Sequence, residues 1–275
     1  MKKIIELKKT EELENYLSNL TKTQKIDFGI YVRDKSNILF RYKENEIFPA
    51  ASLVKVPLAA LILKKIQEGN LKLTQSIKID SKVPGAGIIK DLSIKRYKLI
   101  DLITLTLIMS DNTASNTLIN LTSFDEINNF IKNLGFKNTC IKRKFMVDLI
   151  SPPVNFTTAY EMTEIFYKLL NDEILNFKNK ILFFEILSKQ HFQEKIPKLI
   201  KKDTIVCNKT GDIEGISHDS AVIFKEKSIK NGIKKGDYLI ITILTSFSKE
   251  VERDFVNKII GEVALKMYSN WVKGE

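Results

Sequence analysis

The distribution of strand-like and helix-like segments along the chain is the feature that most constrains its fold. Strand-like runs, rich in β-branched and aromatic residues, occur near the two ends of the 275-residue chain. They cover residues 26–34, 37–44, 204–210, 217–226 and 237–246. The segment between the two groups, about 50–203, has mostly helical periodicity, and further helical patterns cover 6–20 and 248–271.

This order of segments predicts an α+β fold. Several connections have hairpin length, which favours antiparallel pairing because parallel strands need longer crossovers. We therefore expect an α/β sandwich, in which terminal helices pack on an antiparallel sheet of about five strands. The sheet domain would comprise residues 1–49 and 204–275, with an all-α subdomain of residues 50–203 inserted, in one compact two-lobed unit.

The charge balance is strongly positive. The chain has 44 Lys and Arg against 33 Asp and Glu, a net charge of +11. The lysines are spread along the whole chain, and no basic run is interleaved with aromatic residues as in single-strand-binding grooves. We therefore expect a solvated basic surface that attracts anions weakly, and no nucleic-acid partner.

No segment predicts a membrane span or a secretory leader. No apolar run approaches the roughly 18 residues that a membrane span needs. Only a few apolar residues precede Glu6, too few for a signal-peptide core. The chain as numbered is thus expected to be cytoplasmic, or extracytoplasmic if a leader has been removed.

The cysteines predict neither a metal site nor a redox motif. Cys140 and Cys207 are far apart, without C-x-x-C spacing, and His191 and His218 are the only histidines. The phosphate-binding and dinucleotide-binding glycine patterns are also absent from the sequence. We expect two reduced cysteines, no metal, no cofactor and a monomeric protein.

The first element that suggests chemistry is S-x-x-K, formed by Ser52 and Lys55 at the start of a helical pattern. The i, i+3 spacing places the hydroxyl and the amine on one helical face, within hydrogen-bond reach. A lysine can take the serine proton if burial and a neighbouring cation lower its pKa. Ser246 and Lys249 have the same spacing where a strand-like run meets the last helix, and we interpret that match as accidental.

Two further elements distinguish the first match from the second. An SDN triplet, Ser110 to Asn112, ends an apolar run, and a KTG triplet, Lys209 to Gly211, ends a strand-like run. S-x-x-K, SDN and KTG in this order resemble the signature of penicillin-recognising serine acyltransferases. The segments FPAASLVKVPLA, MSDNTASNTLI and NKTGDIEGISHD resemble class A β-lactamases, and the likeness covers roughly residues 26–270. It implies a β-lactamase/transpeptidase-like fold.

The resemblance implies catalytic roles for four residues. Ser52 corresponds to the acylated nucleophile and Lys55 to a base for acylation. Ser110 corresponds to the group that passes a proton toward the leaving nitrogen, with electrostatic support from Lys209.

It also implies a substrate-binding wall. Asn112 would hydrogen-bond the side-chain amide of the substrate, and Thr210 with the KTG lysine would bind its carboxylate. Gly211 would let substrate lie close to the strand backbone. The backbone N–H groups of Ser52 and Asp212 would form the oxyanion hole. Asp111 is expected to bond backbone groups in its own loop.

One part of the family pattern is missing. Class A β-lactamases have an E-x-x-L-N motif between SDN and KTG, whose glutamate activates the water that hydrolyses the acyl-enzyme. Between Glu126 and Glu161 the only carboxylate is Asp148. It is either a substitute base or a loop carboxylate paired with Arg143 or a nearby lysine. An aspartate is one methylene shorter, and a base must lie within about 3 Å of the water that it activates.

Counting along this segment leaves two residues at the place of the glutamate. Counting forward from Gly135 puts Phe145 there, whereas counting back from Met162 puts Lys142 there. Neither supplies a carboxylate. We therefore expect intact acylation and slow or differently arranged deacylation.

Three other features have two interpretations each. His218 and Asp219 could be a base with its orienting carboxylate, but bonding between neighbouring strands is the more plausible role. Residues 83–87 resemble a loop of the family that borders the cleft, and otherwise form a turn. Asn155 and Thr158 are expected to cap the next helix rather than to touch substrate.

The sequence is compatible with three functions. The first is a β-lactamase-family serine hydrolase that β-lactams acylate at Ser52. The second is a D-alanyl peptidase, an esterase or a penicillin-binding protein with little β-lactam turnover, and the missing glutamate favours it. Both act on a small molecule. The third is a binding protein without catalysis, and the three complete motifs argue against it.

Overall fold

The computed structural model describes residues 2–147, 154–171 and 174–273. Its main sheet has five strands in the order β2-β1-β9-β8-β7, and each neighbouring pair is antiparallel. The strands are β1 (Ile26–Asp34), β2 (Ile38–Tyr42), β7 (Ile205–Ile213), β8 (Ile216–Phe224) and β9 (Tyr238–Phe247). The predicted sheet, assembled from both ends of the chain, is confirmed.

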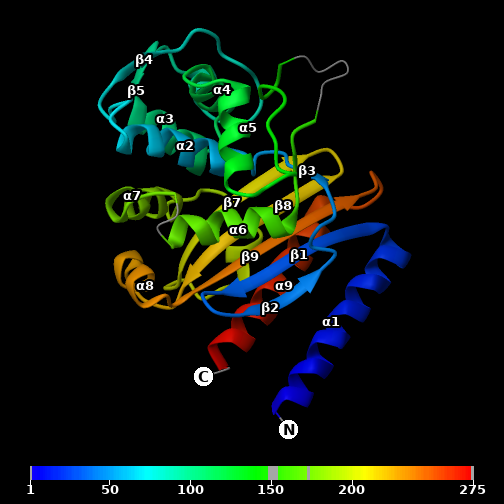
Figure 1. Cartoon of the computed structure of the whole chain (residues 1–275). Helices are drawn as coiled ribbons and strands as arrows, with labels where there is room; N and C mark the ends of the chain where they lie inside the picture. Colours follow the sequence, from blue (N-terminus) through cyan, green and yellow to red (C-terminus); the bar gives the residue numbers. More distant parts are fainter. Residues whose placement is uncertain (1, 148–153, 172–173, 274–275) are drawn as a thin grey trace.

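Helices cover both faces of this sheet (Figure 1). The terminal helices, α1 (Lys2–Gln24) and α9 (Arg253–Lys273), pack on one face, and α6 (Ala159–Leu170) packs on the other. Strand β1 therefore has apolar residues on both sides. Ile30 and Val32 join the core beneath the terminal helices, whereas Tyr31 joins the core on the side of α6.

The second lobe is mostly helical, as predicted. It contains α2 (Lys55–Gln67), η1 (Ile89–Asp91), α3 (Leu99–Ile108), α4 (Asn112–Asn120), α5 (Phe124–Asn133) and α7 (Phe177–Leu187). Two short ribbons pair β3 (Phe48–Pro49) with β6 (Phe156–Thr157) and β4 (Ser76–Lys78) with β5 (Arg96–Lys98). Near the sheet lie η2 (Ile196–Leu199) and α8 (Ile229–Lys235). The exact division of the chain at residues 49/50 and 203/204 stays a prediction.

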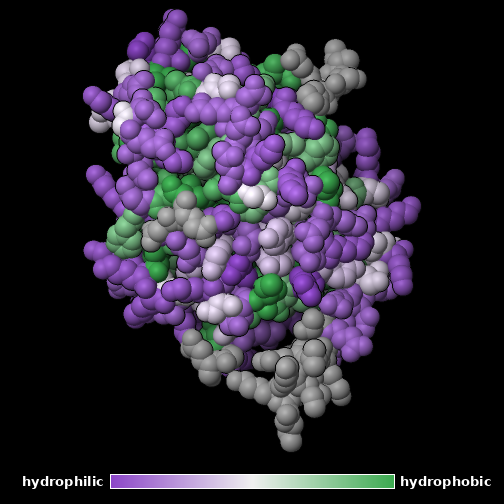
Figure 2. All heavy atoms as spheres, in the orientation of Figure 1, coloured by the Kyte–Doolittle hydropathy of each residue, from purple (hydrophilic) through white to green (hydrophobic). Residues whose placement is uncertain are grey.

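Helix α2 lies at the centre of the helical lobe. Its first nine residues are all buried, because other elements of the lobe surround it on every side. The surface of the molecule contrasts with this core, because hydrophilic residues cover most of the face seen in Figure 2. None of the helices in the described ranges is both long enough and apolar enough to cross a membrane.

Of the two predicted caps, one is confirmed and one is wrong. The Thr158 hydroxyl accepts a hydrogen bond from the N–H of Glu161 and caps α6. Asn155 instead binds the backbone of the preceding loop, where its Oδ1 accepts from the N–H groups of Lys142 and Arg143. Its chain position, three residues further from the helix, leaves it beside that loop.

Candidate active site

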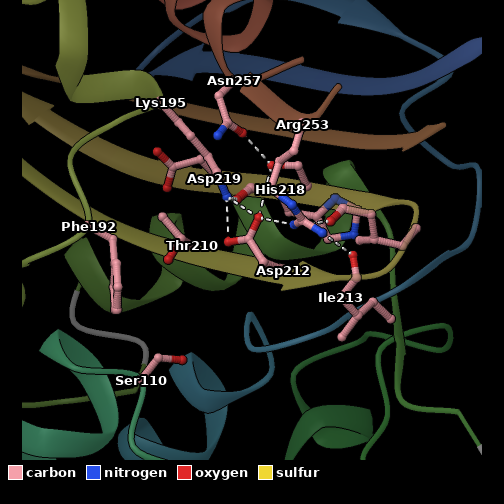
Figure 3. Close-up of polar contacts among 12 residues, drawn as sticks. Ser110, Phe192, Lys195, Thr210, Asp212, Ile213, His218, Asp219, Arg253 and Asn257 are labelled. Carbon is pink, nitrogen blue, oxygen red and sulfur yellow. Dashed lines mark hydrogen bonds and ion pairs between the residues drawn. The ribbon is translucent and has the colours of Figure 1, made fainter. Parts of the chain in front are cut away.

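The three motifs meet where the helical lobe contacts β7. The Lys55 amine donates to the Ser110 carbonyl (2.6 Å) and to Oδ1 of Asn112 (2.8 Å), and it lies 3.1 Å from the Ser110 hydroxyl. Lys209 reaches the same hydroxyl from β7, also at 3.1 Å. Figure 3 shows Ser110 beside the strand that carries Thr210. One hydroxyl is thus held between two amines that are 55 and 99 residues away in sequence.

Ser52 lies in the turn immediately before α2 and is half-buried. The preceding Ala51 has a φ of +46°, so a left-handed residue sets the approach to the serine. Within the described ranges no hydrogen bond joins the Ser52 hydroxyl to Lys55. The amine of Lys55 donates to the Ser110 loop and to Asn112 instead.

Burial makes both amines weak bases. Burial, and after it the charge of Lys209, hold the pKa of Lys55 well below its usual value. Burial lowers the pKa of Lys209 to about 7, although the carboxylates of Asp212 and Asp219 oppose the shift. A neutral amine near neutral pH can accept a proton, so the site suits acyl transfer through a serine.

Asp111 holds the SDN loop, as expected. Its carboxylate accepts from the N–H of Ala114 (2.8 Å), which caps α4, and from the N–H groups of Ile88 (2.7 Å) and Ile89 (2.9 Å). Ser110 has a φ of +51°, a left-handed conformation that only firm anchoring on both sides maintains. The aspartate therefore keeps the neighbouring serine aimed between the amines.

The loop of residues 83–87 borders the site, as the resemblance implied. Asn112 donates from its backbone to Ala86 (3.0 Å) and from its side chain to Pro84 (3.3 Å). A Cβ on Gly87 would lie only 2.3 Å from Asp111 Cγ, and its φ is +104°, so glycine is required there.

Gly211 has a packing role in addition to the role toward substrate, which stays a prediction. A Cβ at this residue would meet Ala51 Cβ at 3.2 Å and the Ala50 carbonyl at 3.3 Å. The glycine therefore lets the Ser52 turn pack tightly against β7. Thr210, beside it, is buried in the same wall.

Asp212 is the centre of an ion-pair network that the motifs did not predict. Its carboxylate accepts from Lys195 (2.8 and 2.7 Å), Arg253 (2.7 Å) and the Ser217 hydroxyl (3.0 Å). Figure 3 shows Lys195 and Arg253 approaching it from separate elements. Lys195 and Arg253 lie in segments with many other basic residues, and no spacing in the sequence distinguishes them.

His218 links three elements of the fold. Nδ1 accepts from the N–H of Thr245 on β9 (3.0 Å), so Nε2 carries the proton and donates to the Pro49 carbonyl on β3 (2.8 Å). Burial lowers the pKa of His218 to about 4, which keeps the ring neutral. The geometry supports the strand-bonding role rather than that of a base.

Phe145 lies where forward counting places the missing glutamate. Its ring centroid is 4.2 Å from the Lys55 amine, a cation–π distance. Asn116 holds its backbone, donating to the Phe145 carbonyl and accepting from its N–H, both at 2.8 Å. Lys142, the alternative, is exposed and lies over Phe156 instead. Asp148 lies outside the described residues.

Glu161 does not fill the gap. Its carboxylate accepts from the N–H groups of Lys137, Asn138 and Thr139 and from the Thr139 hydroxyl. It thus stabilises the start of the loop. In the described part of the chain, no group of three or more His, Cys, Asp or Glu side chains could hold a metal ion.

Comparison with known proteins identifies the family. A model of the beta-lactamase enzyme family matches residues 11–271. Beta-lactamase VEB-1 of Pseudomonas aeruginosa is 23% identical and covers 93% of this chain and 87% of its own length. Beta-lactamase regulatory protein BlaB of Streptomyces cacaoi is 29% identical over 40% of this chain and 37% of its own length.

Solved structures share the fold. PBP-A superposes with a TM-score of 0.83 at 21% identity, over 95% of this chain and 96% of that one. A beta-lactamase from Sphaerobacter thermophilus gives a TM-score of 0.81 at 23% identity, over 94% and 95%. The family match spans nearly the whole chain, and the predicted fold is confirmed. The chain belongs to the beta-lactamase enzyme family and is a serine hydrolase of the class A beta-lactamase-like kind.

Proposed function

We propose that the protein is acylated by β-lactams at Ser52 and releases the acyl group slowly. The observation that carries this proposal is the Phe145 ring, which lies against Lys55 where a water-activating carboxylate is expected. The natural substrate is then a small acylated molecule, such as a D-alanyl peptide or an ester, or a β-lactam that is turned over slowly.

Acylation begins at Ser52. Its Oγ attacks the amide carbon while neutral Lys55 takes the hydroxyl proton, which the lowered pKa of this amine favours. The backbone N–H groups of Ser52 and Asp212 stabilise the oxyanion that forms. The C–N bond then breaks.

The leaving nitrogen needs a proton, and Ser110 supplies it. Its hydroxyl lies 3.1 Å from Lys55, so the proton taken from the nucleophile passes through it to the nitrogen. Lys209 lies at the same distance on the other side and favours the charge that develops during this transfer. With Thr210 it also binds the carboxylate of the substrate, and Asn112 contacts the amide of the side chain.

Hydrolysis of the acyl-enzyme needs a second base that can reach a water molecule. A phenyl ring has no lone pair to accept a proton, and here it covers the Lys55 amine. A PBP-A variant has been solved as an acyl-enzyme complex with penicillin G, and it shares this fold with a TM-score of 0.83. Slow release favours the peptidase, esterase or penicillin-binding role over that of an efficient β-lactamase.

Intact-protein mass spectrometry after addition of a penicillin tests the proposal. A covalent adduct that persists for many minutes supports it. An adduct that disappears as penicilloate accumulates overturns slow release, and Asp148→Ala then tests whether that aspartate is the base. No adduct and no product would exclude β-lactams as acylating substrates.

We also propose that the protein works as a monomer, since the residues assigned to both acylation steps come from one chain. Light scattering after size-exclusion chromatography tests this. A dimer mass at low protein concentration would contradict it.

A further inference from the structure

We propose that Lys195 and Asp212 are positioning residues, an ion pair with a buried lysine that acts on Lys209 through its charges and holds the end of β7 in place for acylation. This inference rests on the proposed function, because it assigns a role in the same acylation step. The motifs assign no role to Lys195, and the resemblance implies only a backbone role for Asp212.

The pair is built into the wall behind the KTG strand. The Lys195 side chain is fully buried, and its amine donates to both carboxylate oxygens of Asp212 (2.8 and 2.7 Å) and to the His218 carbonyl (3.0 Å). Lys195 directly precedes η2, whereas Asp212 lies on β7, three residues after Lys209. The dashed lines in Figure 3 mark these contacts.

A second cation, Arg253, also binds the Asp212 carboxylate. Arg253, at the start of α9, donates to Asp212 (2.7 Å), to the Ile216 carbonyl (2.9 Å) and to the Ile213 carbonyl (2.8 Å). It thereby clamps both ends of the β7–β8 turn. Although burial opposes it, the pairing with Lys195 and Arg253 lowers the pKa of Asp212. Lys195, Arg253 and the Ser217 hydroxyl all donate to this carboxylate, so we assign it an effect through position and charge.

Charged groups from several elements face Lys209. Carboxylates of Asp212 on β7, Asp219 on β8 and Glu194 before η2 each favour its protonated form, whereas Lys195 disfavours it. Lys55 faces it from α2 across the Ser110 hydroxyl. These charges act on a group whose pKa burial has already lowered to about 7.

The two partners therefore act on Lys209 with opposite sign. Removal of the Asp212 charge lowers the pKa of Lys209, and removal of the Lys195 charge raises it. A merely structural pair would behave differently, since the loss of either partner would disturb the same strand end. Opposite shifts are thus the signature of the proposed role.

The experiment measures penicillin acylation rates against pH for Asp212→Asn, Lys195→Met and the wild type. Protonated Lys209 binds the substrate carboxylate, so the rate falls on the alkaline side as this amine loses its proton. We expect the alkaline limb to move down by about 0.5 to 1 pH unit in Asp212→Asn and up by a similar amount in Lys195→Met. The double variant, which removes both charges, should return the limb close to that of the wild type.

Lys195→Met leaves a charge without its buried partner and could unfold the protein. In that case Asp212→Asn is compared with the double variant and with Lys195→Arg. Lys195→Arg keeps the charge and should leave the alkaline limb in place. The matched control is Glu164→Gln, because Glu164 and Arg33 form another largely buried ion pair (2.6 Å) between β1 and α6. It should lower stability without moving the limb.

The pKa of Lys209 is also measured directly by NMR titration of lysines labelled at Cε, which needs no substrate. Shifts in the same direction for Asp212→Asn and Lys195→Met, or no shift in either, would overturn the inference. If penicillin fails to acylate the wild type, the proposed function fails, while the NMR titration still decides whether the pair controls Lys209.

Discussion

The two sides of the site, the Lys55–Ser110–Lys209 cluster and the loop after α5, differ in the functional groups that they contribute. On one side Lys55, Ser110 and Lys209 form a buried, hydrogen-bonded set that suits acylation. On the other, the loop after α5 places the Phe145 ring against the same Lys55, and no carboxylate of the described loop reaches it.

The loop that carries Phe145 is held in place by contacts to its backbone. Asn116 binds the backbone N–H and carbonyl of residue 145, and Glu161 binds the backbone at the start of the loop. Both anchors contact main chain, so they do not depend on which side chain residue 145 carries, although the Phe145 ring itself packs against the core. The acylating side differs, because contacts between the Lys55, Ser110, Asn112 and Lys209 side chains depend on which residues are present.

The most severe test removes the acylating side. Ser52→Ala removes the proposed nucleophile, and Lys55→Ala removes the proposed base, so neither variant should show a covalent penicillin adduct by mass spectrometry. Ser246→Ala and Lys249→Ala are matched controls, because these residues have the same spacing outside the site. Normal labelling of Ser52→Ala would refute the assignment of the nucleophile.

The next test supplies what the other side lacks. Phe145→Glu places a carboxylate beside Lys55, so the lifetime of the penicillin adduct should fall by about 10²-fold or more, measured by the decay of adduct mass. Phe145→Gln removes the ring without adding a base and should retain a long lifetime. Equal lifetimes for the two variants would show that a missing carboxylate is not what limits deacylation.

The acylating side also depends on a neutral histidine. The pKa of His218 is about 4 in the fold, against an unfolded value near 6.5, so its contribution to stability is complete above about pH 6.5 and is lost as the pH falls. We therefore compare the unfolding free energy of the wild type with that of His218→Gln at each pH. The difference between the two proteins should be about 2 kcal/mol smaller at pH 5 than at pH 7.

Denaturant titrations of both proteins at the two pH values measure this difference. Asp219, whose pKa burial raises to about 7, titrates in both and cancels from the comparison. His191→Gln is the control, because His191 is exposed. A constant difference between the two proteins across this range would mean that His218 is not held neutral.

The smallest expected effect concerns the contact between Gly211 of the KTG motif and the turn that precedes Ser52. Gly211→Ala places a Cβ against Ala51 and Ala50 and should slow acylation by about tenfold, because it displaces the Ser52 turn. Stopped-flow acylation rates measure the loss. Ala51→Gly in the same chain removes the opposing Cβ and should restore the rate. Failure to restore it would favour the original expectation that the glycine makes room for substrate.

Much of this site could be predicted from local sequence. The strand-like and helix-like segments followed from periodicity, and the three motifs followed from spacing within each segment. The structure brings Lys55, Ser110 and Lys209 together as these motifs imply. The roles of Lys195, Arg253 and Asn116 could not be predicted, because their partners are 17, 41 and 29 residues away.

The sequence by itself determined the antiparallel sheet built from both ends of the chain and the family, and it predicts the acylating residues, because hydrophobic periodicity and short motifs are local properties. Only the tertiary structure decided three points. It places Phe145, and not Lys142, against Lys55, it shows that Nε2 of His218 carries the proton, and it shows that Gly211 packs against the Ser52 turn. Each of these depends on distances between distant segments. Packing sets such distances, and burial then determines which side chains remain charged.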